Sequence, residues 1–127
     1  MSLKMKAIVA TGKGGSDVLE EKEVPLPWPA ASGDVLVQLR AAALNPADVF
    51  FRRLGGYVER PGPFILGHDG AGIVEAVGAE VAGVTPGDRV CFCYGGIGAT
   101  YGTYAEYAVV PAHVLAIIPP DVAALTS

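Results

Sequence analysis

One short segment of the chain gathers most of the side chains that could bind a metal ion, orient a cofactor or donate a hydrogen bond to a substrate. They are Asn45, Asp48, Tyr57, His68 and Asp69. A histidine beside carboxylates is typical of metal sites, whereas a carboxamide and a phenol are donors that can stabilise negative charge on a reacting oxygen. The segment therefore leaves three interpretations open: a metal centre, one wall of a metal-free cleft, or only a turn, a helix and a strand.

Local rules give the first part of this segment a definite structure. Asn45 is a good helix N-cap ahead of Pro46, and Asp48 falls in the first turn, where the helix dipole favours a carboxylate. We predict a short helix that ends near Leu54, because the glycines at 55 and 56 follow. These rules also supply purely structural roles, since Asn45 is explained as a cap and Asp48 as a helix stabiliser.

The elements around this helix are predicted to be strands. Residues 34–44 alternate apolar and polar side chains with the period of two that is typical of a half-buried strand. Edge strands are expected at 6–11 and from 18 onward, where the prolines at 25, 27 and 29 prevent pairing inside a sheet. Further strands are expected within 70–78, 85–92, 95–111 and 113–122. The pattern predicts a small, mainly β, partly barrel-like domain with one short helix.

Composition limits the partners and the compartment. The 127 residues include 17 Gly and 10 Pro, too many breakers for a helical bundle, and a formal net charge of -4 argues against nucleic acid as a partner. No apolar run reaches the length of about 20 residues that spans a membrane, and a signal peptide is not evident at the start. Cys91 and Cys93 alternate along a strand, so we expect buried free thiols and a cytoplasmic location.

Three ordered motifs carry a family resemblance: GHDGAGIVEAVGAEV, TPGDRV and GTYAEYAVVP. With them, residues 5–122 resemble the N-terminal half of the medium-chain dehydrogenase/reductase superfamily, and NPADVFFRRLGGY is similar to its zinc-free quinone oxidoreductase branch, which includes zeta-crystallin. The resemblance implies a GroES-like, partly open β-barrel. It also implies reduction of a quinone or conjugated carbonyl by hydride from NADPH, with a small-molecule quinone or enone substrate and a homodimer as the assembly.

The same resemblance bears on the metal question. Zinc-dependent relatives carry a cysteine ligand where this chain has Asn45, and a Gly-His-Glu motif where it has Gly67, His68 and Asp69. A neutral carboxamide is a poor replacement for a thiolate on zinc, and the cysteine-rich lobe of many relatives is absent, so we expect no metal. The resemblance instead implies that Asn45 and Tyr57 are donors beside the nicotinamide.

The set of site residues that we expect is therefore small. Asn45, Tyr57 and His68 are the candidate catalytic residues, and Asn45 and Asp48 are the candidates for contact with the cofactor. His68 and Tyr57 also have structural explanations, as a hydrogen-bonded residue at a strand start and as a surface ring.

A dinucleotide-binding fingerprint is not expected in this chain. The glycines of GAGIVEAVG begin a strand, whereas a phosphate-binding loop must open a helix. We therefore expect residues 1–127 to be a GroES-like catalytic domain, truncated before the nucleotide-binding domain and inactive alone. Two alternatives stay open: a fragment of a zinc-dependent alcohol dehydrogenase, favoured only by His68, and a free-standing GroES-like module that binds or assembles without catalysis.

Overall fold

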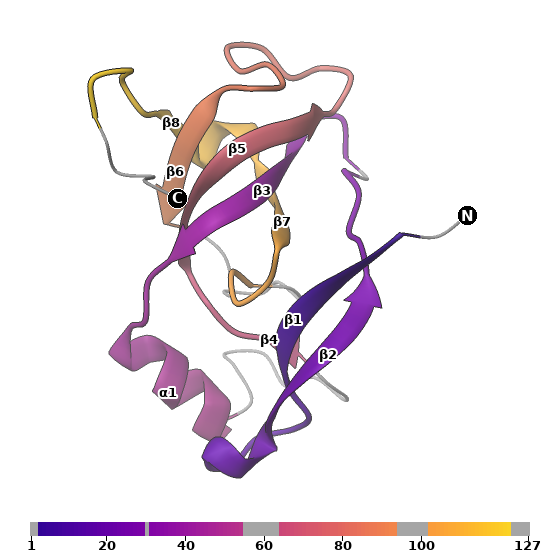
Figure 1. Ribbon diagram of the computed structural model, residues 1–127, viewed down its shortest axis with the longest axis vertical. Coiled ribbons are helices and arrows are strands. Elements are labelled where there is room, and N and C mark those ends of the chain that lie inside the picture. The colour runs from indigo at the N-terminus through magenta and orange to yellow at the C-terminus, as the bar shows by residue number, and fades with distance from the viewer. Residues whose placement is uncertain (1–2, 30, 55–63, 94–101, 123–127) are drawn as a thin grey trace.

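The fold is described by a computed structural model of residues 3–29, 31–54, 64–93 and 102–122 (Figure 1). Within these ranges the chain is mainly strand, with one α-helix. In chain order the elements are β1 (Lys4–Ala10), the 3-10 helix η1 (Ser16–Val18), β2 (Leu19–Pro25), β3 (Asp34–Ala42), α1 (Pro46–Leu54), β4 (Phe64–Ile65), β5 (Asp69–Val77), β6 (Arg89–Cys93), β7 (Tyr107–Pro111), the 3-10 helix η2 (Ala112–Val114) and β8 (Ala116–Ile117). The predicted helix is confirmed over Pro46–Leu54.

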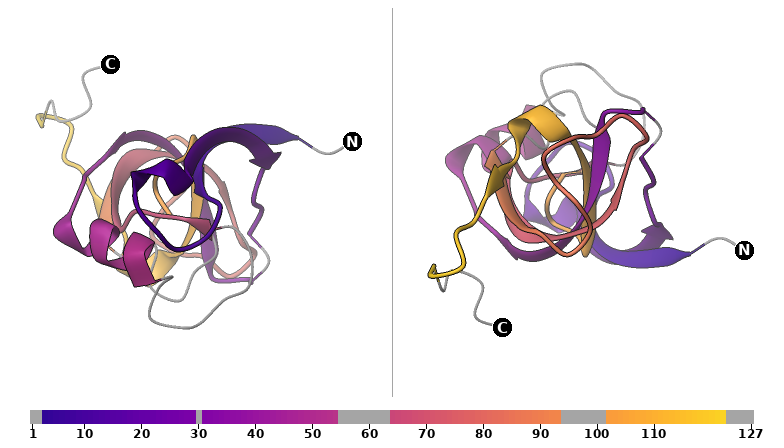
Figure 2. Two further views of the ribbon diagram at one scale, coloured as in Figure 1. Left: turned by 90° about the horizontal axis from the view of Figure 1, so that it is seen from below. Right: turned by 90° about the horizontal axis from the view of Figure 1, so that it is seen from above.

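Two antiparallel sheets make up the fold, in the orders β2-β1-β4 and β7-β3-β5-β6-β8. The segment that leads into β7 joins them, because the N–H of Ile8 donates to the carbonyl of Tyr104 at 2.8 Å and the N–H of Glu106 donates to that of Lys6 at 3.2 Å. Seen along the vertical axis of Figure 1, the strands curve around a common interior (Figure 2). The sheets do not close on each other, so the predicted partly open barrel is confirmed.

The main core lies inside the larger sheet. Val35 and Val37 of β3 pack with Val74 of β5, Val90 of β6 and Val110 of β7, all fully or almost fully buried. Val35 and Val37 share the core-facing side of β3 as predicted, but Leu36 on the opposite side is also fully buried, so burial does not alternate over this half of the strand. The pairing register shifts after Leu39, and the alanines at 41 and 42 are exposed rather than part of the core.

A second core supports the smaller sheet. Met5, Ala7 and Val9 alternate along β1 and pack with Ile65 of β4. The prediction of an edge strand is confirmed for β2 but wrong for β1, which is paired on both sides because two residues of β4 extend the sheet beyond it. β2 ends at Pro25, as the prolines required.

Two further expectations have clear outcomes. Cys91 and Cys93 are free thiols, but the prediction that they are buried is wrong: Cys91 is half-buried and Cys93 is exposed. Phe92 between them points into the core, so the strand alternation places both thiols on the outer face of β6. Among the described helices, none combines the length and apolar character needed to cross a membrane.

Gly72 is required where β3 and β5 come together. A Cβ atom at this position would lie 2.0 Å from the carbonyl oxygen of Gln38, which belongs to the backbone and cannot turn away. We expect Gly72→Ala to lower the free energy of unfolding by about 3 kcal/mol, because the two central strands must separate to admit the methyl group. Urea denaturation measures the change.

Gly33→Ala is the matched control for this substitution. A Cβ atom at Gly33 would meet no atom within 4 Å, so the free energy of unfolding should stay unchanged or rise slightly. Equal stability of the two variants would contradict the close approach of β3 and β5.

Candidate functional site

The buried carboxylate of Asp48 organises the site. Asp48 is 3% exposed, and among the described residues it contacts three hydrogen-bond donors, one just before its helix and two distant in the sequence. Its Oδ2 accepts the backbone N–H of Asn45 at 2.9 Å and the hydroxyl of Tyr104 at 2.6 Å, and its Oδ1 lies 2.9 Å from Nδ1 of His68. A charge removed from water needs such partners, so the position of Asp48 fixes the positions of the other three residues.

The start of α1 explains how Asp48 reaches this place. Asn45 directly precedes the helix, and its carbonyl accepts the N–H of Asp48 at 2.9 Å. The Asp48 side chain returns to the N–H of Asn45, which is the contact made by the third helical residue in a capping box. The predicted helix-stabilising role of Asp48 is therefore confirmed, while the Asn45 side chain is engaged elsewhere.

His68 has a defined tautomer at this site. Its ring is 7% exposed and belongs to the short connection between β4 and β5. Because a carboxylate can only accept hydrogen bonds, the contact with Asp48 requires that Nδ1 carry a proton. The structural interpretation of His68 as a hydrogen-bonded residue near a strand start agrees with this geometry.

Tyr104 is the member of the site that sequence reasoning missed. It lies 56 positions after Asp48, and no spacing rule connects a helix start with the segment before β7. Burial raises the pKa of the Tyr104 phenol strongly, and the hydrogen bond to Asp48 and the charge of that carboxylate raise it further. The hydroxyl is therefore a permanent donor at neutral pH and not a base.

Asn45 and Asp69 form a second contact beside the first. Nδ2 of Asn45 donates to Oδ2 of Asp69 at 2.9 Å. Asp69 opens β5, directly opposite Cys93 of β6 in the strand register. A hydrogen bond from the Cys93 thiol and the one from Asn45 lower the pKa of the Asp69 carboxyl, against a smaller raising effect of burial. Asp69 is consequently ionised at neutral pH. The hydrogen bond to Asp69 raises the pKa of the exposed Cys93 thiol, and the charge of that carboxylate raises it further.

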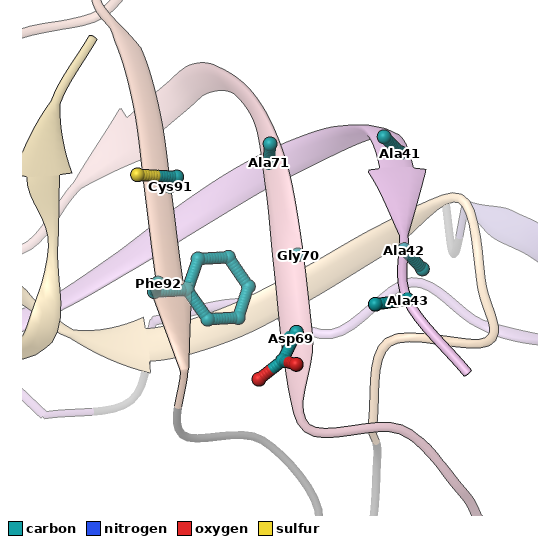
Figure 3. A pocket seen from close by; sticks show the side chains of 8 residues that line it. All are labelled: Ala41, Ala42, Ala43, Asp69, Gly70, Ala71, Cys91 and Phe92. Carbon is teal, nitrogen blue, oxygen red and sulfur yellow. The ribbon is translucent and has the colours of Figure 1, made fainter. Parts of the chain in front are cut away.

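An open pocket of about 340 Å³ lies next to Asp69. Figure 3 shows it between the end of β3, the start of β5 and the end of β6. The ring of Phe92 lies beside Gly70, and the Asp69 carboxylate lies at the lower edge of the pocket. The remaining lining is small and mostly apolar: Ala41, Ala42, Ala43, Ala71 and Cys91. This arrangement suits a flat apolar group with one polar end near Asp69.

The structure brings most of the sequence-predicted site residues together. Asn45, Asp48 and His68 are linked through the Asp48 carboxylate, and Asp69 joins them through Asn45. Tyr57 falls in residues 55–63, outside the described part of the chain, so its predicted role stays a prediction.

Among the described residues, the side chains near Asn45 do not make up the ligand set of a catalytic zinc. A carboxylate on the far nitrogen of a histidine also occurs around zinc, but a catalytic zinc needs three protein ligands. In the described ranges no three His, Cys, Asp or Glu side chains are grouped so that they could hold a metal ion. Asn45, at the position of the missing thiolate, donates its Nδ2 to Asp69 instead.

The hydrogen bond of Tyr104 gives the first prediction for this site. Tyr104→Phe removes one donor from a buried carboxylate, and we expect the free energy of unfolding to fall by about 1.5–3 kcal/mol. Chemical denaturation measures it. Tyr107→Phe is the control, since its hydroxyl makes no hydrogen bond to the described residues, and equal losses in the two variants would contradict the role given to Tyr104.

Comparison with known proteins agrees with this geometry. The model of the family described as "Alcohol dehydrogenase GroES-like domain" matches residues 31–120. Quinone oxidoreductase of Mus musculus is 39% identical over 107 residues, which cover 83% of this chain and 30% of that protein. The 2-methylene-furan-3-one reductase of Solanum lycopersicum is 38% identical over 128 residues, which cover 93% of this chain and 32% of that protein.

A solved structure extends the agreement to three dimensions. The mycobacterial protein Rv1454c, solved in complex with NADPH, matches with a TM-score of 0.81 and 35% identity, covering 93% of this chain and 35% of that one. This chain thus spans about a third of the length of the relatives it matches. Matched motifs, fold and relatives agree that the chain belongs to the alcohol dehydrogenase GroES-like domain family, in the quinone oxidoreductase branch of the medium-chain dehydrogenase/reductase superfamily.

Proposed function

We propose that residues 1–127 are the GroES-like catalytic domain of an NADPH-dependent, zinc-independent oxidoreductase that reduces quinones or conjugated carbonyls by hydride transfer. The observation that carries the proposal is the Asn45–Asp69 contact, which places a carboxamide donor, rather than a metal ligand, beside an apolar pocket. The names of the relatives support the substrate class, since they include a quinone oxidoreductase and a 2-methylene-furan-3-one reductase. NADPH, when bound, supplies the hydride, and a nucleotide-binding domain outside this chain holds most of it.

The residues of this chain bind and polarise the substrate. Hydride addition leaves negative charge on the carbonyl oxygen, and a fixed N–H aimed at that oxygen lowers the barrier. Asn45 has two N–H groups on Nδ2, and only one of them is used by Asp69. We assign the second to the substrate oxygen, with Tyr57 as a further donor.

Asp48 and His68 support the proposed role of Asn45 as a donor to the substrate. Among the described residues, the Asp48 carboxylate is bonded to Asn45, His68 and Tyr104, so we propose that Asp48 influences the cofactor by holding Asn45 and the start of α1 in place. His68 is retained as a candidate for a role in the cleft, since its imidazole is fixed at the same carboxylate.

The proposed partners follow from this assignment. They are a small quinone or enone as substrate and a second copy of the protein in a homodimer, in the cytoplasm. Nucleic acid is not proposed, because the net charge of -4 would repel its phosphates.

Turnover tests the proposal directly. The gene product that carries this chain should oxidise NADPH in the presence of 1,4-benzoquinone or methyl vinyl ketone, at an unchanged rate after treatment with EDTA. Asn45→Ala should lower kcat/KM by about 100-fold, the usual effect of removing one donor to a developing oxyanion. Absorbance at the NADPH maximum follows the reaction.

The control for this variant is Gln38→Ala, which removes a half-buried carboxamide from β3, away from the Asn45–Asp69 contact. Its kcat/KM should equal that of the unaltered protein. Loss of activity on chelation, or full activity of Asn45→Ala, would contradict the proposed mechanism.

A further inference from the structure

We propose that Asp69 is a positioning residue that fixes the orientation of the Asn45 carboxamide. In this orientation an N–H group of Asn45 stays available to a carbonyl oxygen in the cleft. The inference rests on the proposed function for its chemical meaning. The contact itself is independent of that function, because it joins two residues of this chain at 2.9 Å.

Backbone hydrogen bonds hold Asn45 and Asp69 close to each other. Ala42 pairs with Gly70 in the β3–β5 ladder, and the N–H of Ala43 donates to the carbonyl of Asp69 at 3.3 Å. Asn45 follows two residues later and is held at its own N–H by Asp48. Both ends of the connection between β3 and α1 are therefore fixed, and Asn45 has little freedom to leave Asp69.

The chemistry of the two groups determines the orientation. A carboxamide can turn its oxygen or its nitrogen toward a neighbour at almost the same cost, because the two ends have the same shape. A carboxylate has acceptors only, so turning the Asn45 oxygen toward Asp69 would bring two electron-rich oxygens together. The ionised Asp69 thus selects the orientation in which Nδ2 faces it.

The partial burial of Asn45 and Asp69 strengthens the preference for the orientation in which Nδ2 of Asn45 faces Asp69. Asn45 and Asp69 are both half-buried, where a charged hydrogen bond is stronger than in water. The hydrogen bond from the Cys93 thiol contributes to keeping Asp69 ionised, since it lowers the pKa of the carboxyl together with Asn45. The second N–H of a planar carboxamide diverges from the first by about 120°, the angle at a trigonal nitrogen, so it points away from Asp69 and stays a donor.

Asp69→Asn is the decisive substitution, because it keeps size and shape while removing the charge. An asparagine at 69 pairs with Asn45 in either orientation, so about half of the molecules should present an oxygen rather than an N–H to the substrate, and they should repel its carbonyl. We expect kcat to fall about twofold, because about half of the molecules keep the productive orientation of Asn45, with KM nearly unchanged. Asp69→Glu, which restores an acceptor-only group, should recover part of the loss.

The matched control is Glu75→Gln, which removes one negative charge from an exposed position of the same strand. It should leave kcat and KM unchanged. In an Asn45→Ala background, Asp69→Asn should cost nothing further, because a residue that acts through Asn45 has no effect once the carboxamide is gone. Additive losses in this cycle would overturn the proposal.

A spectroscopic readout separates this inference from the proposed function. In ¹⁵N-labelled protein the side-chain NH₂ group of Asn45 should give one pair of amide resonances, with one proton shifted downfield by the charged hydrogen bond. In Asp69→Asn that shift should disappear, whether or not the protein reduces quinones. Identical Asn45 side-chain resonances in the two proteins would overturn the positioning role, and absence of quinone turnover with the expected resonances would overturn only the proposed function.

Discussion

The site depends on one buried charge. The Asp48 carboxylate lies almost entirely out of water, and such a group is tolerated only when donors surround it. Its three donors come from the turn before α1, from the connection between β4 and β5, and from the segment before β7. If any of these segments moved away, a lone pair of the carboxylate would be left unpaired in a low-dielectric interior. The requirement to satisfy Asp48 therefore adds a polar link among three parts of the chain that backbone hydrogen bonds already bring close together.

The Asn45–Asp69 contact is connected to this buried charge through Asn45. The backbone of Asn45 donates to Asp48, and its side chain donates to Asp69. One residue thus links a structural carboxylate in the interior to an ionised carboxylate at the edge of the pocket. A residue at a helix-capping position can therefore also present a donor to a substrate. The backbone N–H makes the capping contact, and the side chain stays available to the cleft.

Sequence reasoning predicted those features of the fold that follow from neighbouring residues. The alternation in residues 34–39 placed β3, and Asn45, Pro46 and the glycines after Leu54 bounded α1. It failed where pairing between distant segments decides the outcome. β1 is an inner strand because two residues of β4, more than fifty positions later, pair with its free side, and no local pattern announces that pairing.

The candidate site shows the same difference between features set by local sequence and features set by contacts between distant segments. Asn45, Asp48 and His68 were found from residue type and from the family resemblance, but the hydroxyl of Tyr104 was not, because its partner is fixed only when the strands assemble. The exposure of Cys93 was also missed, since an apolar residue type in a strand does not reveal which face the sheet leaves uncovered. Asp69 was not among the expected catalytic or cofactor-contacting residues, and its importance appears only in its hydrogen bond with Asn45.

The corner at Gly67 has a mechanical consequence. β4 belongs to the smaller sheet and β5 to the larger one, and the chain passes between them through Leu66, Gly67 and His68. Gly67 has a φ of 113°, and a side chain there would collide with Thr103, so the corner is tight and cannot be re-formed easily by another residue. His68 therefore stands on the crossing between the two sheets, with Asp69 already in the larger one. The packing of the Gly67 backbone against Thr103 therefore also sets where His68 stands relative to the Asn45–Asp69 pair, so a residue with no reactive group contributes to the geometry of the site.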